Sequence, residues 1–211
     1  TVLREMKRWG ADPPFPSGED GRRAAADDPA WGWADTALLH AFLRKLRPRR
    51  VVCAGAGAFV PALLDLNELV LGRTISVTVV DPEAEKLRPL LKKEEEEKVR
   101  LLPSRVHEVP FDTYTSLAPG DVLLVDTSHV SKTGSELNHL VFRVLPRLKG
   151  GVHVHAANVF WPFEYPAAWV TEGRAFNEAY LWRAFLMNNS QWEIAVFASF
   201  LETAHRSGIL K

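Results

Sequence analysis

Residues 51–60 read VVCAGAGAFV, an apolar run that ends in two glycines and continues into a second apolar stretch. Gly55 and Gly57 allow the backbone to turn sharply and approach a ligand, and a helix that follows would point its free N–H groups into the same cleft. A dinucleotide fingerprint also requires a small residue at position 60, where this chain has Val60. The turn therefore fits a nucleoside without a pyrophosphate better than NAD, although a tight strand-to-helix turn without a ligand would have the same sequence.

Five further apolar or β-branched runs follow this segment and predict strands. They are ISVTVVD (75–81), VRLLP (99–103), DVLLVD (121–126), GVHVHAA (151–157) and EIAVFASF (193–200). Apolar residues at helical spacing predict helices at 35–46, 59–71, 82–98, 134–148 and 174–189. Because strands alternate with helices and several strands are apolar throughout, we expect an α/β fold, with a doubly wound, Rossmann-like, mostly parallel sheet that carries helices on both faces.

Length and composition narrow the class of protein. A chain of 211 residues favours one core, and residues 1–34 are predicted to form an N-terminal arm or lid on a domain at 35–211. Lys and Arg number 26, as do Asp and Glu, so formal neutrality gives no attraction to nucleic acid or to an anionic membrane. With one cysteine and no apolar run of the roughly 18 residues that span a membrane, we expect a cytoplasmic protein with a small-molecule partner; its oligomeric state stays open.

An acid closes the second predicted strand. Asp81 lies about 25 residues beyond the glycines, where a carboxylate can accept hydrogen bonds from both hydroxyls of a ribose. It also precedes Pro82, so it can serve as the N-cap of the next helix. The two roles are compatible, and glycine turn, strand, acid and helix in this order favour a cofactor that contains adenosine.

The fourth strand ends in Asp126, followed by Ser128, His129 and Lys132. An ionisable group that closes an apolar strand is costly to desolvate unless it is paired, and at this edge of the sheet it faces the ligand crevice. His129 or Lys132 can act as a general base there, and a surface loop with ordinary charges is the alternative. Farther on, Thr133 and Glu136 have the spacing of a capping box, which predicts a helix start.

The fifth strand places two more polar side chains at the same edge. We expect His155 and Asn158 to approach Asp126, while His153 is expected to be a structural strand histidine. Asp126 and Asn158 are weak candidates for binding a divalent cation, since two firm ligands are few. No metal site is therefore predicted.

Residues 160–166, FWPFEYP, would then form an apolar wall over the cleft, in which Glu164 is the one obvious charge. Trp161 and its aromatic neighbours suggest a partly apolar acceptor, or they belong to the core. Arg174 and Glu178 are about one turn apart on a predicted helix, so they either hold a polar group of a substrate or form a surface ion pair.

At this point the residues resemble a known family. The segments DVLLVDTSHVSKTGSELNHLVFRVLPRLKGGVHVH (121–155) and FWPFEYPAAWVTEGRAFNEAYLWRAFL (160–186) look like those of class I S-adenosylmethionine-dependent methyltransferases, in particular a bacterial small-molecule methyltransferase domain related to the catechol O-methyltransferase group. The similarity runs from about residue 33 to residue 200. Two departures stand out: Cys53 occupies a position that is usually an acid, and Ala157 and Asn158 stand where His and Asp are usual.

The resemblance implies S-adenosylmethionine as the cofactor and assigns roles to the residues above. Cofactor-binding residues would be Cys53, Gly55, Ala56, Gly57, Asp81, Asp126 and Thr127; catalytic residues Asp126, His129 and His155; and substrate-binding residues Asn158, Trp161, Glu164, Arg174 and Glu178. The expected reaction is methyl transfer to an oxygen, less readily a nitrogen, of a small acceptor, with His129 as the base and Asp126 orienting it or the substrate. The alternatives are a protein that binds the cofactor without methyl transfer, and a cyclisation or elimination of S-adenosylmethionine on the same scaffold.

Overall fold

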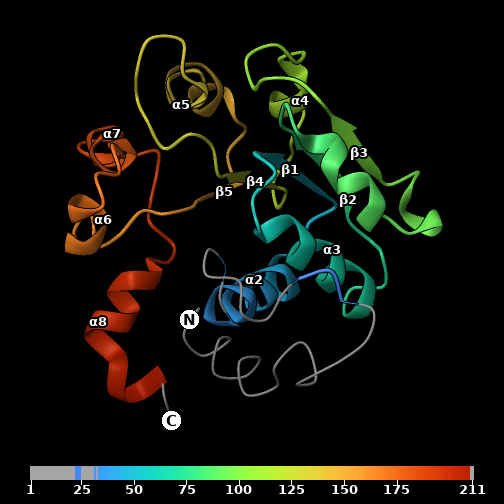
Figure 1. Cartoon of the computed structure of the whole chain (residues 1–211), viewed down its shortest axis with the longest axis horizontal. Coiled ribbons are helices and arrows are strands. Elements are labelled where there is room, and N and C mark those ends of the chain that lie inside the picture. Colours follow the sequence, from blue (N-terminus) through green and yellow to red (C-terminus); the bar gives the residue numbers. More distant parts are fainter. Residues whose placement is uncertain (1–21, 25–30, 32, 210–211) are drawn as a thin grey trace.

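The computed structural model describes residues 22–24, 31 and 33–209, and its centre is a five-stranded parallel sheet in the order β3-β2-β1-β4-β5. The strands are β1 (Arg50–Ala54), β2 (Ser76–Val80), β3 (Val99–Leu102), β4 (Val122–Val125) and β5 (His153–Ala156). Every neighbouring pair is parallel (Figure 1). The predicted α/β, Rossmann-like fold is therefore confirmed, with β1 in the middle of the sheet as its apolar sequence suggests.

The helices and helical turns lie before, between and after these strands. They are α2 (Trp33–Leu46), α3 (Phe59–Leu69), the 3₁₀ turns η1 (Ala84–Leu90) and η2 (Lys93–Glu95), α4 (Asp112–Thr115), α5 (Glu136–His139), the π-helical η3 (Leu140–Val144), the 3₁₀ turn η4 (Leu145–Arg147), α6 (Ala167–Thr171), α7 (Glu178–Leu186) and α8 (Ala198–Ile209). None of the helices in these described ranges is both long and apolar enough to cross a membrane.

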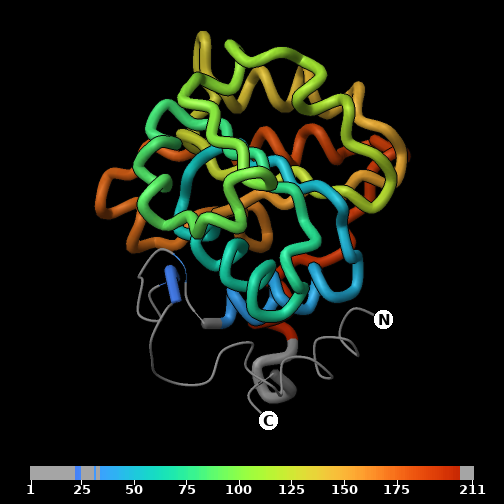
Figure 2. The backbone as a smooth tube through the Cα atoms, turned by 90° about the vertical axis from the view of Figure 1, so that its right-hand side faces the viewer, coloured from blue at the N-terminus to red at the C-terminus, as the bar shows by residue number. Residues whose placement is uncertain are grey.

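Two buried clusters lie on alternating residues of the strands, as the pleat of a sheet requires. One packs α2, α3 and η1 against residues such as Cys53 and Val79. The other packs α4, α5, η3 and α7 against residues such as Val52 and Leu123. Figure 2 shows these layers from the side, with α2 and α3 at the bottom and α4 and α5 at the top. Apolar clusters thus cover both faces of the sheet, so a ligand would bind at an edge formed by the strand ends.

Three local predictions were wrong. Residues 193–197 form no strand, and α8 begins at Ala198, because Phe197 and Phe200 pack their rings on Trp161 instead of joining the sheet edge at β5. The predicted helix at 82–98 is broken into η1 and η2, since Pro89 interrupts it. The last predicted helix starts at Glu178 and leaves Arg174 outside it.

The predicted capping box is also wrong. The N-cap of α5 is Ser135, whose hydroxyl accepts a hydrogen bond from the Asn138 backbone N–H at 3.3 Å. Thr133 lies before this cap and is exposed. The cap therefore starts two residues later than the sequence pattern suggested, after the turn that Gly134 makes with a φ of 73°.

Most of the expected arm at 1–34 lies outside the described residues, but Arg23 is anchored firmly. Its guanidinium forms ion pairs with Asp65 at 3.2 Å, Glu68 at 2.9 Å and Glu95 at 2.7 Å, all with buried side chains. The backbone N–H of Arg23 also donates to Asp65. One cation thus joins the N-terminal segment to α3 and η2. Among the described residues Arg23 is the one ion-pair partner of Asp65 and Glu95, whereas Glu68 also pairs with Arg73 and Lys92.

Candidate functional site

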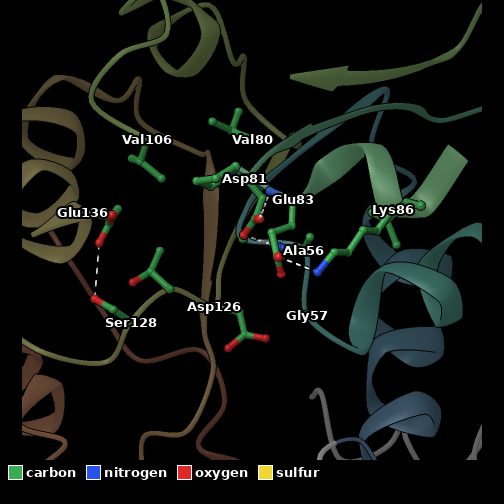
Figure 3. A pocket seen from close by; sticks show the side chains of 14 residues that line it. Ala56, Gly57, Val80, Asp81, Glu83, Lys86, Val106, Asp126, Ser128 and Glu136 are labelled. Carbon is green, nitrogen blue, oxygen red and sulfur yellow. Dashed lines mark hydrogen bonds and ion pairs between the residues drawn. The ribbon is translucent and has the colours of Figure 1, made fainter. Parts of the chain in front are cut away.

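A cavity of about 390 Å³ lies at the carboxyl edge of the sheet, among the ends of β1, β2 and β4. The strand order reverses between β1 and β4, and ligands of open α/β sheets bind in the crevice at such a point. Figure 3 shows the side chains of Asp81, Asp126 and Glu136 around this space. A second cavity of similar size, near Arg50 and Arg100, lies toward the amino ends of the strands and away from this crevice.

The glycine turn after β1 is shaped by its contact with Asp126. Gly55 has a φ of 114°, and a Cβ atom there would lie 1.8 Å from the backbone oxygen of Asp126. A Cβ atom on Gly57 would lie 1.9 Å from Oδ2 of the same residue. Only glycine fits at either position without a shift, and the turn therefore brings β1 and β4 together at the cavity wall.

Asp81 lies where the sequence placed it and accepts two backbone hydrogen bonds. Its Oδ2 accepts one from the Ala56 N–H at 3.1 Å, and its Oδ1 accepts one from the Glu83 N–H at 2.7 Å. It is not the N-cap of η1, which is Glu83. Since a carboxylate has about four acceptor sites, Asp81 keeps lone pairs for hydroxyl groups of a ligand in the cavity.

The charge of the cavity wall is mainly negative. Its acids are Asp81, Glu83, Asp126 and Glu136, and the only cation among the described lining residues is Lys86, which pairs with Glu83. Ser128, also in the wall, donates to Glu136 at 3.2 Å. A ligand with positive charge and free hydroxyl groups would suit this wall, and one with phosphate groups would be repelled.

The rest of the cavity wall supplies apolar surface and one buried hydroxyl group without a hydrogen-bond partner. Val80, Leu87 and Val106 provide the apolar part, enough to pack against a flat ring. The Thr127 hydroxyl is buried and has no hydrogen-bond partner in the described part of the chain. Because buried polar groups are nearly always paired, this hydroxyl is a natural contact for a bound molecule.

His129 sits beside the cavity between two acids. Its Nδ1 lies 2.6 Å from Glu178 Oε1 and its Nε2 lies 3.3 Å from Asp126 Oδ1, while the Asn158 amide approaches Nε2 at 3.2 Å. Burial is the largest effect and lowers the pKa of His129, but hydrogen bonds and charges from Asp126 and Glu178 together raise it to about 9. With this pKa the ring is an imidazolium at neutral pH and already holds the proton that a general base would accept, so the role of His129 as a base stays a prediction.

The backbone around His129 is held in an uncommon conformation. His129 and Asn158, which contact each other, both have a φ of 57°, the left-handed region that costs residues other than glycine free energy. Such residues persist where surrounding contacts fix them, and they concentrate at functional sites. The ends of β4 and β5 thus meet through His129 and Asn158. The sequence placed Asn158 near Asp126, and the side chains of both residues contact Nε2 of His129.

Glu178 is not a surface residue of an ion pair with Arg174. It is only 1% exposed and binds His129, so its side chain contacts His129 and does not face a substrate. Sequence reasoning missed this pair, because the two residues are separated by 49 positions and no local pattern connects them. Asn177, next to Glu178, was missed as well, although it accepts a hydrogen bond from the Ser131 backbone N–H at 2.6 Å.

The other predicted substrate residues do not gather at the cavity. Trp161 is 47% exposed and packs against rings of the C-terminal segment. Glu164 accepts a hydrogen bond from the Tyr180 hydroxyl at 2.9 Å. Arg174 pairs with Glu172 at 2.7 Å and lies 4.3 Å over the Trp169 ring. Each of these three residues contacts an aromatic side chain outside the cavity wall, and of the five predicted substrate residues only Asn158 and Glu178 contact His129.

Cys53 and His155 lie behind the cavity. Cys53 is buried in the core under α3, and burial raises the pKa of its thiol well above the usual range, so it is a small apolar residue and not a substitute acid. His155 is half-buried, with its ring 6.3 Å from that of Trp31. Burial lowers the pKa of His155, opposed by the charges of Asp126 and Asp35, and the ring is therefore neutral at neutral pH.

The weak metal candidates Asp126 and Asn158 both contact the same ring atom, Nε2 of His129. In the part of the chain that the structure describes, no three His, Cys, Asp or Glu side chains come together in a way that could hold a metal ion. Asp126 presents its Oδ1 to that atom and Asn158 presents its amide nitrogen. The other base considered, Lys132, is exposed at the surface of the loop.

Comparison with models of protein families gave no match, and comparison with curated protein sequences gave none either.

Proposed function

We propose that the protein is an S-adenosylmethionine-dependent methyltransferase that acts on an oxygen of a small-molecule acceptor. The observation that carries the proposal is the acidic cavity at the reversal of strand order, walled by the glycine turn, Asp81 and Asp126. The resemblance of residues 121–155 and 160–186 to class I methyltransferases supports the same cofactor. Formal neutrality of the chain supports a small molecule over nucleic acid as the partner, and the free thiol of Cys53 agrees with a cytoplasmic setting.

Electrostatics favour this cofactor over a dinucleotide. S-adenosylmethionine carries a sulfonium, an ammonium and a carboxylate group and is positive overall, whereas NAD carries a diphosphate. Four acids of the wall, offset only by Lys86 among the described lining residues, attract the first kind of charge and repel the second. The ribose hydroxyls would donate to Asp81, and the adenine ring would pack on the apolar part of the wall beside Leu87 and Val106.

When bound, S-adenosylmethionine would supply an activated methyl group on sulfur for in-line transfer. The protein's task is then to exclude water, align the acceptor and accept its proton. Of the three predicted catalytic residues, only Asp126 lines the cavity, so it is assigned to orient the acceptor hydroxyl. Asp126 is also assigned to receive the acceptor's proton, since His155 lies behind the cavity and His129 already carries a proton.

Product analysis tests this function. The protein is incubated with S-adenosylmethionine labelled in its methyl group and with pooled phenols, carboxylic acids and alcohols, and products are measured by mass spectrometry. The proposal predicts S-adenosylhomocysteine together with a labelled methyl ether or ester. Asp126→Asn should lower turnover at saturating S-adenosylmethionine by about 10²-fold or more, beyond what any loss of cofactor affinity explains. If Asp126→Asn keeps the turnover of wild type at saturating S-adenosylmethionine, the assignment of the proton acceptor is wrong.

Two alternatives rest on the departures from the family pattern at Cys53, Ala157 and Asn158. A binding protein without methyl transfer would retain S-adenosylmethionine unconverted across every acceptor pool. A cyclisation or elimination would release methylthioadenosine, with no S-adenosylhomocysteine. The same product analysis therefore separates all three functions by mass.

A further inference from the structure

Glu178 is the buried carboxylate that the proposed reaction does not use directly. It is 1% exposed, its Oε1 lies 2.6 Å from Nδ1 of His129, and it belongs to the first turn of α7. An acid in the first turn of a helix is stabilised by the helix dipole, whichever way its side chain points. The orientation of Glu178 into the interior, toward one ring nitrogen of His129, therefore needs a second explanation.

The contacts continue from Glu178 to the cavity wall. The opposite ring nitrogen of His129 lies 3.3 Å from Oδ1 of Asp126. The other oxygen of Asp126, Oδ2, lies against Gly57, only 1.9 Å from the place of a Cβ atom there. One unbroken series of contacts thus runs from α7, through the His129 ring and the Asp126 carboxylate, to the glycine turn.

The backbone reinforces the same connection. The His129 carbonyl accepts hydrogen bonds from the N–H groups of Asn177 at 3.1 Å and Glu178 at 3.3 Å. The Asn177 side chain binds Ser131 through both its oxygen, at 2.6 Å, and its nitrogen, at 3.3 Å. These four bonds fix the loop after β4 to the start of α7 and help to maintain the left-handed conformation of His129.

The groups that face His129 come from three elements of the fold. Asp126 comes from the end of β4, Asn158 from the end of β5 and Glu178 from α7, and the Phe176 ring lies 4.7 Å from the His129 ring. Tyr165, beside Glu178, has a pKa raised to about 12, mainly by burial, and stays uncharged. The imidazolium therefore has two carboxylate partners, one on each ring nitrogen, and its orientation is determined by both.

We propose that Glu178 is a positioning residue for the cofactor: it fixes the orientation of His129, and through His129 it holds Asp126 against the glycine turn. The inference rests on the proposed function, because the benefit of a fixed Asp126 is a preorganised cofactor cavity. Glu178 itself does not line the cavity, so it acts on the cofactor only through His129 and Asp126.

The test is the affinity for S-adenosylhomocysteine, measured by isothermal titration calorimetry on four proteins: wild type, Glu178→Gln, His129→Gln and the double variant. Glu178→Gln should weaken binding by about tenfold, the effect expected when a hydrogen bond to a charged group is lost. In the His129→Gln background, the Glu178→Gln change should add nothing, because its route to Asp126 is already absent. Glu164→Gln is the matched control, since Glu164 is an acid of the neighbouring segment that contacts Tyr180 and not His129.

A spectroscopic readout separates positioning from a merely structural role. In ¹⁵N-histidine NMR at neutral pH, wild-type His129 should show both ring nitrogens protonated, and in Glu178→Gln this signature should be lost. If Glu178→Gln does not fold, the double variant replaces it, because it removes both charges of the pair, and it should bind as weakly as His129→Gln.

The outcomes are distinct. A wild-type protein that does not bind S-adenosylhomocysteine overturns the proposed function, and this inference with it. A wild-type protein that binds, together with Glu178→Gln or His129→Gln variants of unchanged affinity, overturns the inference alone. Equal weakening by Glu178→Gln in the presence and absence of His129 also overturns it, because Glu178 would then act only as part of the fold.

Discussion

Replacing Gly57 with alanine tests separately whether the glycine turn is needed for folding and whether it is needed for ligand binding. The new Cβ atom would lie 1.9 Å from Oδ2 of Asp126 and 3.0 Å from its Cγ, and its three nearest neighbours are all side-chain atoms. Gly57 does not have a positive φ, so alanine adopts its conformation without strain. The carboxylate of Asp126 must therefore move, and it gives up its contact with His129.

The cost of this movement is about 2 kcal/mol, the value of one hydrogen bond between charged groups. For a chain of this size each kcal/mol lowers the melting temperature by about 2–4 °C, so the variant should melt about 4–8 °C below wild type. Because Asp126 is displaced into the cavity, binding of S-adenosylhomocysteine should be lost although the protein still folds. Differential scanning calorimetry and titration calorimetry measure the two effects. Gly150→Ala, at an open position with no atom within 4 Å, is the control and should change neither.

Gly55→Ala is the contrasting case. Its Cβ atom would meet the backbone oxygen of Asp126 at 1.8 Å, and its φ of 114° disfavours any side chain. Backbone strain and overpacking together should cost about 2–6 kcal/mol. Gly134 has a φ of 73° but open space around it, so Gly134→Ala measures the cost of backbone strain without overpacking. The reasoning is refuted if Gly57→Ala binds S-adenosylhomocysteine as tightly as wild type, or if Gly55→Ala is no less stable than Gly134→Ala.

Three more predictions concern stability and reactivity. Arg23→Met leaves the buried acids Asp65 and Glu95 without a cation partner, while Glu68 keeps Arg73 and Lys92, and it should destabilise the fold by about 3–5 kcal/mol in urea unfolding at neutral pH; an unchanged midpoint would show that Arg23 does not anchor residues 22–24. His129 has a folded pKa of about 9, above its ordinary value of 6.5, so its stabilisation is complete below pH 6.5 and is lost as pH rises through 9. Unfolding free energies should therefore fall by about 3 kcal/mol over this range, and less in His129→Gln; parallel curves for the two proteins would contradict the assignment. Cys53 is buried and its pKa is raised by burial, so Ellman's reagent should modify it only after unfolding; rapid modification of the native protein would place it at an accessible site.

The parts of the site that depend on strand ends could be predicted from the sequence. Gly55, Asp81 and Asp126 each close or follow a strand, and the parallel order of the sheet brings all strand ends to one edge. Local patterns and one rule of topology are therefore enough to identify these three residues.

The parts that were missed depend on contacts between distant segments. Nothing in the spacing of Arg174 and Glu178 reveals that Glu178 turns inward to His129, because the docking of α7 on the loop after β4 decides it. In the same way, the run at 193–200 has the composition of a strand, but its aromatic rings find partners on Trp161 and Phe163. Local propensity is overridden where packing offers an apolar surface elsewhere.

The central claim is that the acidic cavity holds S-adenosylmethionine through Asp81. Titration calorimetry with S-adenosylhomocysteine on wild type and Asp81→Asn tests it most directly, with Glu85→Gln, an exposed acid of η1 that pairs with Arg88, as the control. We expect wild type and Glu85→Gln to bind equally, and Asp81→Asn to bind at least about tenfold more weakly, because two ribose hydroxyls lose an ionised acceptor. No binding by wild type, or equal binding by Asp81→Asn, would contradict the account.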